Sequence, residues 1–158
     1  MFLWGQKQER TPTWYGVFLE SGEETAAVDT MHYIWNGAWP ANRSPRLEGA
    51  SLDGKTSSQN ARLKPGQRYP IKVQASDPDQ DHLSYRWEIL AESTDLKMGG
   101  DVESKPKALP GLLEDPTKAD TTLKAPTPPG AYRLFVYIFD GHGHAAHANI
   151  PFYVDKQY

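Results

Sequence analysis

Hydrophobic and polar residues alternate along several stretches in the second half of the chain. Because successive side chains of a β-strand point to opposite faces, a strict alternation over residues 82–90 predicts a half-buried strand that encloses Trp87. A weaker alternation over residues 69–75 predicts an earlier strand of the same kind. The apolar residues on the inner faces are Leu83, Tyr85, Trp87 and Ile89 in the strand over residues 82–90, and Ile71, Val73 and Ala75 in the strand over residues 69–75.

The end of the chain predicts a hairpin of two long strands. Two apolar sets with period two stand on either side of the turn sequence Asp140-Gly141-His142-Gly143. Paired strands with this pattern direct both sets to one inner face. The residues are Tyr132, Leu134, Val136 and Ile138 before the turn, and Ile150, Phe152 and Val154 after it. Weaker strand patterns lie around residues 109–113 and 121–123.

The first 46 residues differ from the rest, because they contain the only clear helical pattern and four of the five tryptophans. Ser21 followed by Glu24 has the spacing of a capping box. Apolar residues then recur at helical spacing until Asn36-Gly37 provides a C-terminal stop. We therefore expect a helix at about residues 22–36, inside an N-terminal extension (residues 1–46) that precedes a mainly β, antiparallel sandwich (residues 47–158).

Composition narrows the possible functions. The 158 residues suffice for one ordinary domain with an extension, and 13 Gly with 13 Pro favour many short strands. The net charge of −3 and the absence of a Lys/Arg cluster argue against nucleic acid as a partner. No apolar stretch approaches the roughly 20 residues of a membrane span, and no signal-peptide pattern follows Met1. No catalytic motif occurs, so we do not expect an enzyme.

Three motifs together resemble polycystic-kidney-disease-type (PKD) and bacterial cadherin-like repeats over about residues 47–155. The resemblance implies an immunoglobulin-like sandwich with Trp87 in its core and a tyrosine-corner hydrogen bond from Tyr132. Gln80 stands where those families usually have glycine, which tolerates positive φ. The motifs are Ala75-Ser76-Asp77-Pro78-Asp79-Gln80-Asp81-His82-Leu83-Ser84-Tyr85-Arg86-Trp87, Pro129-Gly130-Ala131-Tyr132 and Asp140-Gly141-His142-Gly143.

Residues 2–16 are similar to the last strand and loop of some bacterial glycoside hydrolase barrels, and the predicted helix resembles the final barrel helix. This resemblance implies that the chain is the C-terminal part of a longer enzyme whose catalytic residues lie elsewhere. The two resemblances together imply a non-catalytic accessory module that packs against a carbohydrate-active enzyme or contacts polysaccharide weakly. They also imply a secreted or periplasmic bacterial location.

Two loops of the predicted sandwich bring acidic and imidazole side chains to one end. The loop after the second strand and the loop after the sixth lie at the same end of such a fold. Carboxylate oxygens are the ligands that calcium prefers, but aspartates in turns also cap backbone amides, and both interpretations stay open. The candidate calcium ligands are Asp77, Asp79, Asp81 and Asp140. His142, His144 and His147 are weaker candidates for zinc or copper.

The outer face of the closing hairpin is aromatic where an exposed face should be polar. Either a sugar ring stacks on it, or the first segment of the chain covers it, and we favour the second. The residues that serve as carbohydrate or interface candidates are Trp4, Trp14, Phe135, Tyr137, Phe139 and Tyr153. Two alternatives to the accessory role follow: a dedicated carbohydrate-binding module, or a standalone protein of unknown function that pairs with a second copy.

Overall fold

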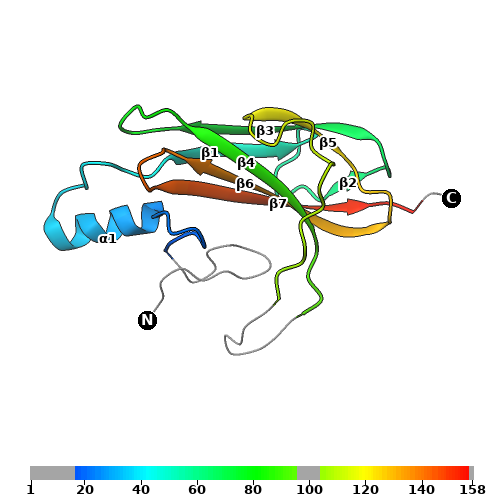
Figure 1. The fold of residues 1–158 in the computed structure, drawn as a ribbon, viewed down its shortest axis with the longest axis horizontal. Coiled ribbons are helices and arrows are strands. Elements are labelled where there is room, and N and C mark those ends of the chain that lie inside the picture. The colour runs from blue at the N-terminus through cyan, green and yellow to red at the C-terminus, as the bar shows by residue number, and fades with distance from the viewer. Residues whose placement is uncertain (1–16, 96–103, 157–158) are drawn as a thin grey trace.

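A computed structural model describes residues 17–95 and 104–156 of the chain. Seven strands and one helix follow each other in the order α1, then β1 to β7 (Figure 1). Their bounds are α1 Ala26–Asn36, β1 Arg46–Leu52, β2 Ala61–Leu63, β3 Arg68–Ser76, β4 Ser84–Ala91, β5 Asp120–Lys124, β6 Gly130–Phe139 and β7 Ala145–Val154. Among the described residues, no helix is long and apolar enough to cross a membrane.

The strands form two sheets that enclose one core. The first sheet has the order β1-β3-β5, and the second has the order β2-β7-β6-β4. All pairings are antiparallel except that between β2 and β7, which is parallel. The predicted fold class, a mainly β immunoglobulin-like sandwich with one helix in the N-terminal extension, is confirmed. The division at residue 46 stays a prediction.

The inner faces carry the residues that the alternation predicted. Ile71 and Val73 of β3 are buried opposite Trp87 and Ile89 of β4, and the inner residues of β6 and β7 complete the core. The indole Nε1 of Trp87 donates to the carbonyl of Lys118 at 2.8 Å, so this buried donor has its partner. The hydroxyl of Tyr132 donates to the carbonyl of Pro128 at 2.8 Å, as the expected tyrosine corner requires.

The helix begins later than predicted. Its N-cap is Thr25, whose side chain makes no capping hydrogen bond, and the Ser21 hydroxyl donates to Glu23 instead. The capping-box prediction is therefore wrong, because Glu24 is engaged elsewhere. The C-terminal stop is correct: Gly37 adopts a φ of 73°, and its N–H donates to the carbonyl of Tyr33.

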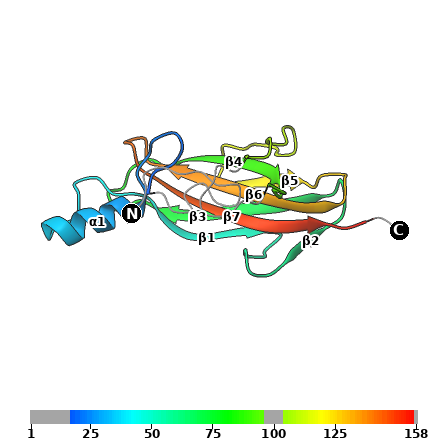
Figure 2. The ribbon, with the colours of Figure 1, turned by 90° about the horizontal axis from the view of Figure 1, so that it is seen from below.

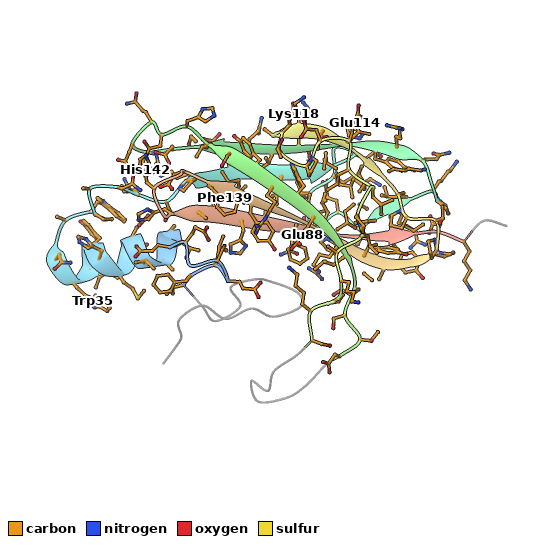
Figure 3. The ribbon with its side chains drawn as sticks, in the orientation of Figure 1. Trp35, Glu88, Glu114, Lys118, Phe139 and His142 are labelled. Atoms are coloured by element: carbon orange, nitrogen blue, oxygen red, sulfur yellow. The ribbon has the colours of Figure 1, made fainter. Side chains whose placement is uncertain are left out.

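Helix α1 extends past the ends of the strands, on the side opposite to β2 (Figures 1 and 2). Asp29 is the one buried residue of the helix. Trp35 is 76% exposed and points away from the sandwich (Figure 3). The predicted apolar stripe of the helix is thus exposed at its C-terminal end, where Ile34 is 69% exposed, and half-buried at Val28 and Met31.

A second, smaller apolar cluster covers the outer face of β6. Leu19, which is 3% exposed, packs with Leu90, Phe135, Tyr137 and Ala145. This cluster places the residues before α1 over the aromatic face of the hairpin. The chain itself therefore provides at least part of the cover that this face requires.

Substitution of Leu19 by alanine tests this cover. Removing a side chain that is 97% buried should lower the free energy of unfolding by about 2 to 3 kcal/mol. Leu47→Ala is the matched control, because Leu47 is 39% exposed and should cost well under 1 kcal/mol. Urea denaturation of both variants measures the difference. Equal stability of the two would show that Leu19 covers nothing.

Candidate functional site

Two groups of potential metal ligands lie at the end of the sandwich where the β3–β4 and β6–β7 turns meet. The first group is Asp77, Asp81 and Asp140, and the second is Glu24, Asp29 and His144. Within each group, one ligand atom from each residue lies within 4.8 Å of the others. His142, on the same β6–β7 turn, marks this end of the molecule in Figure 3.

Three of the four predicted calcium ligands form the first group. The fourth, Asp79, points elsewhere: its Oδ2 accepts the backbone N–H of Arg43 at 2.7 Å. Asp77 Oδ1 accepts the backbone N–H groups of Asp79 at 2.8 Å and of Asp81 at 3.2 Å. These bonds are those of an aspartate that stabilises a turn. A calcium site at this position stays a prediction.

Gln80 occupies the position where the turn needs left-handed backbone, with a φ of 69°. Its N–H donates to the carbonyl of Asp77 at 3.3 Å. The turn therefore keeps the conformation that glycine would adopt most easily, and the aspartate side-chain bonds around it offset the strain of a non-glycine residue.

Asp140 is buried, with an exposed fraction of 3%, and joins the β6–β7 turn to the segment around Asn42. Its Oδ1 accepts the backbone N–H groups of His142 at 2.7 Å and His144 at 3.0 Å, and its Oδ2 accepts from the Asn42 amide at 2.7 Å. Burial alone would raise the pKa of Asp140. The hydrogen bonds from Asn42, His142 and His144 outweigh burial and hold the pKa below its usual value.

The second group joins the N-terminal segment to the β6–β7 turn. Glu24 forms a parallel bridge with His144: the Glu24 N–H donates to the carbonyl of Gly143 at 2.8 Å, and the Ala145 N–H donates to the carbonyl of Glu24 at 2.7 Å. This backbone pairing places the Glu24 carboxylate beside the imidazole. Glu24 Oε2 lies 3.5 Å from His144 Nε2.

The other nitrogen of the imidazole faces the polar network of Asp140. His144 Nδ1 lies 2.7 Å from the Asn42 amide nitrogen and 3.4 Å from Asp140 Oδ2. The His144 side chain is 13% exposed, so these contacts hold its ring in one orientation. Nε2 is consequently the atom directed towards Glu24, while Nδ1 accepts from the Asn42 amide, which Asp140 holds in place.

Asp29 contributes a buried carboxylate from the first turn of α1. One oxygen, Oδ2, accepts the backbone N–H of Ser44 at 2.7 Å. The other, Oδ1, is buried and has no hydrogen-bond partner among the described residues. A buried carboxylate oxygen without a partner is costly, and a cation beside it removes that cost.

Sequence reasoning missed most of this second group. His144 was a weak candidate, and Glu24 was assigned to a helix cap. Asp29 has no signal in the sequence, because an acidic residue in the first turn of a helix is ordinarily explained by the helix dipole. Of the other histidines, His142 lies 3.5 Å from Asp81, and His147 belongs to neither group. Burial lowers the pKa of His147.

The aromatic candidates lie in different places. Phe135 and Tyr137 are 2% and 4% exposed, and Phe139 packs beside them. Burial and a hydrogen bond of 2.7 Å to Glu88 raise the pKa of Tyr137. Tyr153 lies elsewhere, in a groove with Arg62 and Lys156. Trp4 and Trp14 lie outside the described residues.

Comparisons with known proteins give distant likenesses to solved structures alone. No protein-family model matches the chain, and no curated protein matches it. PcoC, a methionine rich copper resistance protein from Escherichia coli, is 14% identical over 71% of this chain and 99% of its own, with a TM-score of 0.41. CopC from Methylosinus trichosporium OB3b is 18% identical over 72% of this chain and 99% of its own, with a TM-score of 0.34. DIP-gamma IG1+IG2 is 14% identical over 70% of this chain and 50% of its own, with a TM-score of 0.35.

These findings overturn the family resemblances expected from the sequence. The similar structures named above are neither PKD or cadherin-like repeats nor glycoside hydrolases, and the assignment to those families is wrong. The predicted role as an accessory module of a carbohydrate-active enzyme is wrong with it. Of the rings predicted for a carbohydrate platform, Phe135 and Tyr137 are buried. The likenesses themselves are too distant to carry a function.

Substitution of Asp140 by asparagine tests the network around His144. The variant should lose about 1 to 3 kcal/mol of unfolding free energy at pH 7. The donating Asn42 amide nitrogen would then face a second amide nitrogen, which cannot accept its hydrogen bond. The folded-state pKa of Asp140 is lowered, so its contribution is present above the unfolded value of about 3.9 and is lost as the pH falls through the folded value. Denaturation between pH 2 and 7 should therefore converge for wild type and variant at low pH.

Asp120→Asn is the control, because Asp120 forms only an exposed ion pair with Lys72. It should change stability by less than about 0.5 kcal/mol at pH 7. If the difference in unfolding free energy between wild type and Asp140→Asn stayed constant down to pH 2, the role of the ionised carboxylate would be contradicted.

Proposed function

We propose that this protein is a metal-binding β-sandwich that holds a divalent ion between Glu24, Asp29 and His144. The observation that carries the proposal is an imidazole that converges with a buried Asp29 carboxylate whose Oδ1 has no hydrogen-bond partner among the described residues; Asp77 Oδ2 shares that lack of a partner, but its group has no nitrogen ligand. Binding rather than catalysis is the proposed activity.

The ligand chemistry favours a transition metal over calcium at this position. Imidazole nitrogen suits zinc, copper, iron and nickel, whereas a site built for calcium uses oxygen ligands alone. Two carboxylates and one imidazole give a mixed set with two negative charges, which a divalent cation neutralises. The separation of at most 4.8 Å between ligand atoms leaves room for an ion at bonding distance from all three after small side-chain movements.

The support behind the ligands also fits a metal centre. Asp140 and His144 share the Asn42 amide, whose nitrogen lies 2.7 Å from Asp140 Oδ2 and 2.7 Å from His144 Nδ1, and this shared contact fixes the imidazole with Nε2 towards Glu24. Ser44 N–H holds the second oxygen of Asp29, so the carboxylate keeps one oxygen for an ion. Backbone pairing fixes Glu24 relative to His144.

Calorimetric titration of the untagged chain with Zn²⁺, Mn²⁺, Cu²⁺ and Ca²⁺ tests the proposal. At least one transition metal should bind at a ratio of one to one. Asp29→Asn and His144→Gln should each weaken that binding by about 10- to 100-fold or more, because a ligand is lost. Both variants should remain folded by circular dichroism.

Asp120→Asn is the matched control, since it removes an exposed carboxylate far from either ligand group and should bind as wild type does. Absence of transition-metal binding to the wild type would overturn the proposal. Unchanged binding in Asp29→Asn and His144→Gln would overturn the assignment of the ligands. Calcium binding that Asp81→Asn abolishes and His144→Gln leaves intact would instead assign an ion to the first group.

A further inference from the structure

The position of α1 relative to the sandwich depends on few apolar contacts. Within the helix only Asp29 is buried, while Ile34 and Trp35 are 69% and 76% exposed. Leu19 is the buried apolar residue of the preceding stretch. We define residues 17–45 as the docking segment, which is the described chain before β1.

Polar contacts also attach the docking segment to the sandwich. Glu24 pairs through its backbone with the strand that begins at Ala145, and Asn42 donates to Asp140. Arg43 N–H donates to Asp79. The attachment therefore centres on the same turn residues that carry the candidate metal site.

The charges within this attachment oppose each other unless a cation is present. The carboxylates of Glu24 and Asp29 converge within 4.8 Å of each other, and Asp29 is 97% buried. Two like charges at this distance repel, and the repulsion is stronger where water is excluded. Release of the docking segment would hydrate both carboxylates and so weaken their repulsion, whereas a bound divalent ion would neutralise it in the docked form.

We propose that metal binding at Glu24, Asp29 and His144 governs whether the docking segment stays on the sandwich. The proposal rests on the proposed function, because it assigns a regulatory consequence to the same site. Two ligands belong to the docking segment and the third to the β6–β7 turn, so only the docked form presents all three. An ion that binds the docked form alone shifts the docking equilibrium by a factor of 1 + [M]/Kd, which is about 100-fold at a free concentration of 100 Kd.

Amide hydrogen exchange of the full chain, resolved by NMR with and without the metal identified by calorimetry, tests this coupling. The informative amides are those of Glu24, Arg43 and Ala145, whose partners are Gly143, Asp79 and Glu24 respectively, because each of these bonds joins the docking segment to the sandwich. Their exchange should slow by about 100-fold at 100 Kd of metal, as the docking equilibrium shifts. Amides of the buried strands, such as that of Trp87, which donates to the carbonyl of Pro116, and that of Val136 in β6, should change far less.

His144→Gln provides the matched variant, because it removes the ligand on the sandwich and leaves the backbone pairing of Glu24 in place. Metal should have no effect on its exchange. If metal binds the wild type but exchange at the three amides is unchanged, or slows only as much as at Trp87 and Val136, the docking proposal is overturned and the proposed function stands. If calorimetry detects no binding, the proposed function itself fails.

Discussion

The buried carboxylate of Asp140 connects the end of the sandwich to the segment that precedes it. Its two oxygens accept hydrogen bonds from the backbone of the β6–β7 turn and from the Asn42 amide. A buried charge without these donors would be costly, so the turn and the segment around Asn42 must adopt one geometry together. That geometry orients His144 and thereby creates the place where Glu24 and Asp29 meet it.

The two ends of the N-terminal attachment follow different physical rules. Leu19 is held by apolar burial against the aromatic face of β6, which depends little on ions or pH. The residues from Glu24 to Ser44 are held by hydrogen bonds and converging charges, which respond to both. The core between the two sheets is a separate apolar cluster. The strands that enclose it therefore do not depend on these hydrogen bonds and charges.

The sequence predicted features whose signal is local and missed those that depend on distant contacts. The alternation around Trp87 and the hairpin about Asp140 reveal strands because each side chain's face follows from its neighbours. The start of α1 was misplaced because Glu24 fits a capping box equally well, and its pairing with the β6–β7 turn has no local pattern. Asn42 and Asp140 are separated by 98 residues, so nothing near either residue could predict their contact. Family motifs misled for a related reason: turn residues recur in many sandwiches.

Helix α1 forms one arm of a loop whose two ends both return to the sandwich. Its 11 residues span about 16 Å. Asp29 lies in the first turn, next to the ligand group, while Trp35 lies near the far tip. The tip is joined to the returning arm, because the rings of Tyr33 and Trp39 stack at 4.6 Å and Arg43 lies over the Trp39 ring. A displacement at the ligand group would therefore reach the exposed tip through both arms of the loop.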